Sequence, residues 1–264
     1  MTLAELKAFL DEKAVQYEHP DFIGTDPIQI PHRYKLQQDI EVAGFLTATI
    51  AWGNRTSILK SATKMMTLMG NSPYDFVCNC NTQQLEQLNG FVHRTFNAVD
   101  FKFFVWGLKA LYASYNTMED AFVANTEATT VAEMQHHFRA KLLQNTHEKR
   151  SEKHIADPLS GSSAKRLNMF FRWMVRSNAK GVDFGLWKQI SPAQLSLPLD
   201  VHTGNIARKL KLLQRKQNDA KALEQLDIAL SLSPSKQHII FEQGLTYMQK
   251  NDFESAFSRF KAAY

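Results

Sequence analysis

The 264-residue chain is poor in cysteine and has no long apolar run. Cys78 and Cys80 are its two cysteines, which suit neither a disulfide framework nor a four-ligand zinc or iron–sulfur site. No stretch of 18 apolar residues is present to span a membrane, and the first seven residues lack the apolar core of a signal peptide. We therefore expect a cytoplasmic protein that does not associate with membranes.

Motifs for nucleotide hydrolysis and for metal chemistry are also missing. The chain has no glycine-rich loop of the P-loop type that would cradle phosphates. His136 and His137 are adjacent and would point to different faces of a helix, and His147 and His154 lie in a charged segment without clustered acids or thiols. The sequence thus predicts no metal and no cofactor.

Basic charge is unevenly distributed along the chain. The formal net charge is +5, but residues 139–180 alone carry ten lysines and arginines against three acids. Residues 201–216 add five basic residues and no acid, so the rest of the chain is net negative. Such a concentration is expected of a surface that binds a phosphate backbone, although a solvated helix face gives the same pattern.

The apolar pattern is helical along most of the chain, and no clear run of alternating β-branched residues occurs. With 44% hydrophobic residues, the chain can bury one large core or two modest ones. We predict an all-α helical bundle over residues 1–215 and a C-terminal helical extension over residues 216–264. The predicted helices cover residues 39–69 with an interruption at Gly53-Asn54, 82–88, 100–115, 117–124, 130–144 and 164–176.

Two junctions between a loop and a helix contain the candidate chemistry. The apolar turn Leu197–Leu199 delivers Asp200 to the start of a basic amphipathic helix, where the carboxylate is either a plain N-cap or a catalytic group beside bound phosphates. A turn-rich loop, residues 157–163, leads to Lys165 at the start of another helix. Lys165 is either a solvated or phosphate-clamping lysine or a nucleophile.

Both junctions resemble those of the helix-hairpin-helix DNA glycosylases, which include endonuclease III and the 8-oxoguanine glycosylases. That family has a Gly-x-x-x-Lys hairpin, which residues 161–168 follow, and an apolar-Asp-x-His segment, which residues 199–203 follow. The chain departs from it at Ser163, where a second glycine is usual, and in the 35-residue separation of Lys165 from Asp200, which is longer than in endonuclease III. The resemblance covers roughly residues 35–215 and implies a bundle of this type.

A closer resemblance is to DUF2400, a bacterial family of unknown function that is itself similar to the helix-hairpin-helix proteins. The stretches that look like its signatures are residues 90–97, 165–170, 172–176, 181–187 and 198–202. This resemblance implies a fold without implying an activity.

The glycosylase resemblance implies a DNA-binding protein that excises a damaged base from duplex DNA, with or without lyase action. Asp200 would stabilise the cationic transition state, and Lys165 would attack C1′. Trp52 would stack on an extruded base or wedge the duplex, unless it is a core aromatic. His93 and Arg94 would contact phosphate or base, unless they anchor their loop. The remaining residues expected at the DNA are Gly161, Ser163, Arg166, Arg172, Asn54, Arg55, His202 and Arg208.

The alternative is a non-catalytic helical module that holds nucleic acid or protein. Residues 240–264 carry Gly244, Tyr247, Ala256, Phe260 and Ala263 at the spacing of a tetratricopeptide repeat. This tail resembles part of such a repeat, which implies a protein partner.

Overall fold

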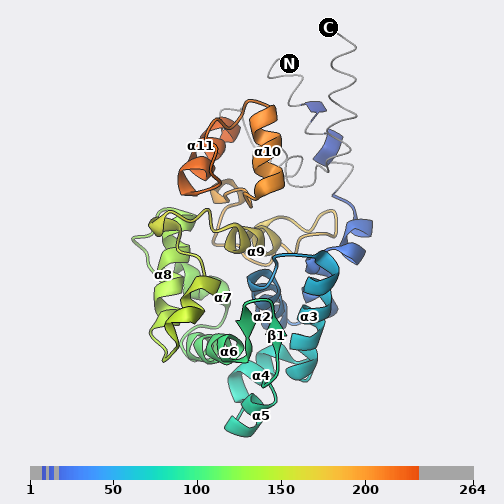
Figure 1. Ribbon diagram of the computed structural model, residues 1–264, viewed down its shortest axis with the longest axis vertical. Helices are drawn as coiled ribbons and strands as arrows, with labels where there is room; N and C mark the ends of the chain where they lie inside the picture. Colours follow the sequence, from blue (N-terminus) through green and yellow to red (C-terminus); the bar gives the residue numbers. More distant parts are fainter. Residues whose placement is uncertain (1–7, 10–11, 15–17, 232–264) are drawn as a thin grey trace.

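The computed structural model describes residues 8–9, 12–14 and 18–231, and in that part the chain is an all-α protein with one short hairpin of strands (Figure 1). The repeat-like tail, residues 240–264, lies outside the described residues. No helix in the described ranges is both long enough and apolar enough to cross a membrane.

The elements follow one another in this order. The first half contains η1 (Pro20–Thr25), η2 (Pro27–Gln29), η3 (Pro31–Arg33), α2 (Gln37–Thr49), α3 (Arg55–Leu68), α4 (Pro73–Asn79), α5 (Thr82–Glu86), β1 (Val92–His93), β2 (Phe96–Asn97) and α6 (Ala98–Tyr112). The second half contains α7 (Met118–Val123), α8 (Val131–Leu143), η4 (Lys149–His154), η5 (Pro158–Ser160), α9 (Lys165–Val175), η6 (Pro192–Gln194), α10 (Val201–Lys209) and α11 (Ala220–Ser231).

Local capping explains where several helices begin. Capping boxes precede α6, α7 and α8, formed by Asn97 with Asp100, Thr117 with Asp120, and Thr130 with Glu133. In each box the cap side chain accepts a hydrogen bond from the helix backbone, and the acidic side chain accepts one from the backbone of the cap. The starts predicted from sequence lie within two residues of the observed ones, because these signals are local.

Helix α2 lies in the main core and packs against α9. Every residue from Ile40 to Thr49 is buried. A Cβ atom built on Gly44 would lie 3.1 Å from Met174 Cε and 3.2 Å from Phe170 Cε2, so the absence of a side chain there permits the close approach of the two helices. The Phe45 ring lies 5.6 Å from that of Phe170, in an edge-to-face arrangement.

A second apolar cluster joins α10 and α11, which lie next to each other beyond α9 in Figure 1. Its members include Leu197 and Leu199 before α10, Ile206 within it, and Leu226 in α11. The cluster therefore uses residues on both sides of position 215, and the division of the chain at that position stays a prediction. The start of α10 lies where the second cluster meets α9.

The interruption expected at Gly53-Asn54 separates α2 from α3.

Strands β1 and β2 pair antiparallel, with Val92 opposite Asn97 and His93 opposite Phe96. Two residues per strand are too few to give an alternating sequence pattern, so this hairpin is a feature that the periodicity did not indicate.

Candidate functional site

Asp200 is the N-cap of α10. Its Oδ1 accepts a hydrogen bond from the backbone N–H of Thr203 at 2.8 Å, and its own carbonyl accepts one from Asn218 Nδ2 at 2.8 Å. Burial alone would raise the pKa of Asp200, but the Thr203 N–H and the Lys165 ammonium outweigh it and lower that pKa below its ordinary value. The carboxylate is therefore ionised at neutral pH, and its side chain is 30% exposed.

Lys165 is the first residue of α9, and its ammonium faces Asp200. The distance from Lys165 Nζ to Asp200 Oδ2 is 3.4 Å, and the Lys165 side chain is 36% exposed. The structure thus brings together the two residues that the sequence analysis selected as catalytic candidates. Both groups remain accessible to solvent and to a ligand.

The loop before Lys165 is held in place by its own hydrogen bonds. Gly161 has a left-handed backbone, with φ of 94°, and its carbonyl accepts a hydrogen bond from the N–H of Ala220 at the start of α11. The carboxylate of Asp157 accepts from the Leu159 N–H at 3.1 Å and from the Ser160 hydroxyl at 2.8 Å. The loop before Lys165 is consequently hydrogen-bonded to α11 through Gly161 and stabilised internally by the Asp157 carboxylate.

Ser163 does not need the conformational freedom of a glycine. The left-handed residues of this loop are Gly161 and Ala164, so the serine introduces no backbone strain. The Ser163 carbonyl accepts a hydrogen bond from the buried Asn168 at 3.1 Å, and Asn168 in turn accepts one from Gln135 Nε2 at 2.8 Å. The asparagine three residues after Lys165 therefore supports the hairpin from within the core.

Trp52 and Arg166 form a stack beside a small recess between α2 and α9. The central carbon of the Arg166 guanidinium lies 4.9 Å from the centre of the Trp52 ring, and the His154 ring lies 5.8 Å from it. Arg166 donates hydrogen bonds to the carbonyls of Thr49 and Lys153. Burial lowers the pKa of Arg166 to about 10. Arg166 is thus turned toward the protein, and it is not a freely solvated phosphate clamp.

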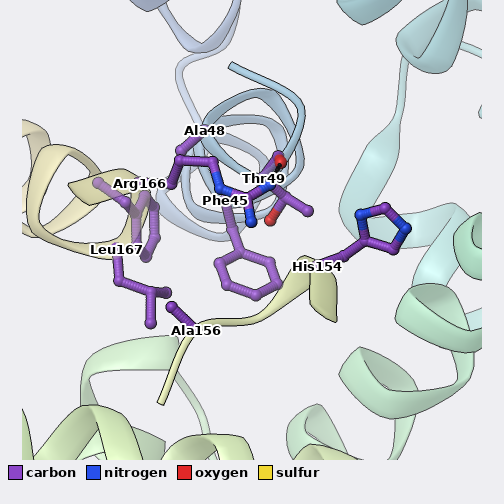
Figure 2. A pocket seen from close by; sticks show the side chains of 8 residues that line it. Phe45, Ala48, Thr49, His154, Ala156, Arg166 and Leu167 are labelled. Atoms are coloured by element: carbon purple, nitrogen blue, oxygen red, sulfur yellow. Dashed lines mark hydrogen bonds between the residues drawn. The ribbon is translucent and has the colours of Figure 1, made fainter. Parts of the chain in front are cut away.

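The recess is partly open to solvent and has room for about one water molecule. Phe45, Leu167 and Phe170 supply apolar walls, and Thr49, His154 and Arg166 supply polar groups. Figure 2 shows Arg166 reaching across from α9 toward Thr49 at the end of α2. This space is far smaller than a ligand pocket, so a ligand larger than water would need a side chain to move out of its way.

Two residues expected at the DNA lie in the interior. Arg172 is 3% exposed, and its Nε lies 3.6 Å from the buried Asp183. His93 is also 3% exposed and is hydrogen-bonded through Nδ1 to the Ser61 hydroxyl and through Nε2 to the Trp52 carbonyl. Burial lowers the pKa of His93. Arg172 thus belongs to a buried ion pair and His93 is held by contacts within its loop region, and the DNA contacts expected of these two residues stay predictions.

The other expected contact residues lie at or near the surface. Asn54 is exposed and caps α3 by accepting from the Ser57 N–H at 3.2 Å, and Arg55 beside it is exposed. Arg94 is exposed and left-handed, with φ of 54°, and His202 is exposed on the first turn of α10. Arg208 is half-buried and donates to backbone carbonyls of its own following loop and to the Asn218 side chain.

Some supporting residues gave no sequence signal. Asn218 reaches Asp200 from 18 positions further along the chain, and His154 stacks on Trp52 from about 100 positions away. No short motif encodes such contacts, because they depend on how the helices pack. Within the described ranges, no three His, Cys, Asp or Glu side chains gather as a group able to hold a metal ion.

A family model described as "Protein of unknown function (DUF2400)" matches residues 26–237, about four fifths of the chain. The match includes both loop-to-helix junctions and the recess beside Trp52. No curated protein and no solved structure matches the chain.

Proposed function

The chain belongs to the DUF2400 family, and we propose that it is a DNA-binding protein that excises a damaged base, with Asp200 and Lys165 as its catalytic pair. The observation that supports this best is the 3.4 Å contact between Lys165 Nζ and Asp200 Oδ2. These residues come from the two junctions that resemble the helix-hairpin-helix glycosylases. The assignment of residues 1–215 to that fold type, with residues 216–264 as an extension that contacts a protein, belongs to the same proposal.

Charge and helix orientation favour a phosphate backbone as the partner. Lys165 and Asp200 stand at the N-terminal ends of α9 and α10, where backbone N–H groups and the helix dipole attract anions. Residues 139–180 and 201–216 contain the concentration of basic charge in the chain. Duplex DNA is therefore the partner that we propose for this surface.

The two side chains suit the two demands of base excision. Cleavage of the bond between a base and C1′ passes through a transition state with positive charge on the sugar, and the ionised Asp200 would stabilise that charge. Transfer of a proton from the Lys165 ammonium to the departing base would free the amine to add to C1′, while the base leaves with the bonding electrons of its bond to C1′. Opening of the sugar ring would then leave an imine between Nζ and C1′.

Borohydride trapping tests this proposal. Duplex oligonucleotides that carry an abasic site or an oxidised base are incubated with the full chain and reduced, and covalent adducts are separated by denaturing electrophoresis. We expect an adduct with the wild-type chain, none with Lys165→Ala, and reduced base release with Asp200→Asn. Lys60→Ala is the matched control, since Lys60 is an exposed lysine in α3, outside both basic stretches.

The competing function is a non-catalytic nucleic-acid-binding module. It is favoured by the fact that Asp200 already has a structural role as the cap of α10. Salt-sensitive DNA binding that persists in Asp200→Asn, with no base release on a broad panel of lesions, would support it. Absence of adducts, of base release and of any change in DNA affinity in both variants would exclude the enzymatic proposal.

A further inference from the structure

The guanidinium of Arg166 lies against both an aromatic face and backbone acceptors. It stacks on the Trp52 ring at 4.9 Å and donates to the carbonyls of Thr49 and Lys153. The guanidinium is thus a planar group that offers two N–H donors along one edge and stacks its face on an indole. Some nucleobases have the same shape and the same donors.

Arg166 and Lys165 serve different sides of α9. Consecutive residues of an α-helix project about 100° apart, and Lys165 contacts Asp200 at α10 while Arg166 contacts Thr49 at the end of α2. The recess and the catalytic pair therefore both take a side chain from the first turn of α9. A base held in the recess and a sugar held at the pair would be neighbours.

The Thr49 carbonyl determines what could replace Arg166. Thr49 is the last residue of α2 and is 5% exposed, and a carbonyl in the last turn of a helix has no partner within that helix. If Arg166 withdraws, the entering group must donate a hydrogen bond, because a buried acceptor without a donor is costly. The negative end of the α2 dipole at this position favours the same choice.

We propose that Arg166 occupies the place of a flipped base with a guanine-type edge, and that such a base enters the recess by displacing it. This inference rests on the proposed function and names its substrate class: a planar nitrogen heterocycle with two adjacent N–H donors. Guanine offers N1–H and the 2-amino group along one edge. Hypoxanthine lacks the 2-amino group, and adenine presents an acceptor at N1, which would face the Thr49 carbonyl unfavourably.

Titration calorimetry with free nucleosides tests this inference without DNA, so its result is independent of base release. Guanosine, inosine and adenosine are titrated into the full chain and into Arg166→Ala. The wild-type chain should prefer guanosine over inosine and adenosine by about tenfold. Arg166→Ala should bind guanosine about ten- to a hundredfold more tightly than the wild type, because no charged hydrogen bonds need to be broken first.

Two further variants complete the test. Trp52→Leu combined with Arg166→Ala should lose most of the gained affinity, since base stacking on an aromatic ring is removed. Arg33→Ala, which changes an exposed arginine in η3 that belongs to neither the recess nor the expected DNA contacts, should bind as the wild type does. Arg166→Met keeps the apolar stem and serves if Arg166→Ala does not fold.

Equal binding of the three nucleosides by the wild-type chain would overturn the inference, and so would binding by Arg166→Ala or Arg166→Met that is no tighter than wild type. In either case Arg166 would be a cap for α2 alone. Guanosine binding by a chain that releases no base would retain the recess and remove the enzymatic proposal.

Discussion

Replacement of Asp200 by asparagine and by alanine separates the helix cap from the negative charge. Asparagine is as good an N-cap as aspartate, so Asp200→Asn keeps the hydrogen bond from the Thr203 N–H and removes the charge that faces Lys165. Asp200→Ala removes both. The difference in stability between the two variants measures the cap, and a catalytic Asp200 predicts in addition that both variants are inactive.

The magnitudes follow from the geometry. The ion pair is about one third exposed, and such pairs contribute roughly 0.2–1 kcal/mol. Loss of an N-cap costs about 1 kcal/mol. We therefore expect the free energy of unfolding to fall by about 0.5 kcal/mol in Asp200→Asn and by about 1.5 kcal/mol in Asp200→Ala. At roughly 3 °C per kcal/mol for a chain of this size, Tm falls by about 1–2 °C and about 4–5 °C.

The stability contributed by the Asp200 charge depends on pH in a defined direction. Because its pKa is lower in the folded chain than in the unfolded one, this stability is fully present above about pH 4 and is lost as the pH falls through the folded value. The Tm difference between wild type and Asp200→Asn should therefore be constant near neutral pH and should shrink in stronger acid.

Single-turnover base release, measured on a substrate found in the lesion panel, gives the functional half of the test. Removal of a charge that stabilises the transition state should slow release by about 100-fold or more in both variants. Thermal melts monitored by circular dichroism give the stability half. Wild-type release by Asp200→Asn, together with a melt lowered only in Asp200→Ala, would refute the catalytic reasoning and leave Asp200 as a cap.

Three further predictions concern the supporting structure. Burial lowers the pKa of His154 to about 4, so the unfolded chain binds more protons than the folded chain between pH 6.5 and 4. The free energy of unfolding in urea should therefore fall by about 2 kcal/mol less from pH 7 to pH 5 in His154→Phe than in the wild type. An equal fall in both proteins would contradict this. Asp183→Asn removes the negative charge that lies 3.3 Å from the buried Arg176 guanidinium. The free energy of unfolding, measured by chemical denaturation, should fall by about 3 kcal/mol. A fall below about 1 kcal/mol would count against a buried ion pair. Gly161→Ala should lower the free energy of unfolding by about 1 kcal/mol, because residue 161 has a φ of 94° even though no atom lies within 4 Å of the added Cβ. Gly24→Ala, which is also in open space but has no positive φ, should lower it little. Equal melting temperatures of the two variants would disprove backbone strain at residue 161.

The all-α fold and the helix starts could be predicted from sequence because their causes are local. The capping box of α8, from Thr130 to Glu133, spans four consecutive residues, and the apolar period of a helix is visible in any window of a few turns. The two loop-to-helix junctions were visible for the same reason. Their side chains could be named as candidates, but their separation in space could not.

Tertiary packing decided which candidates meet and which are buried. Lys165 and Asp200 are 35 positions apart in sequence, and their 3.4 Å contact depends on α10 packing beside the start of α9. In the sequence Arg172 looks like one more basic residue on a basic helix, but in the structure it forms an ion pair with Asp183 in the interior. Arg166, six positions earlier, faces Trp52 and the recess. Sequence determined the charge of each side chain, and the packing of distant segments determined whether that charge faces solvent, a partner or the core.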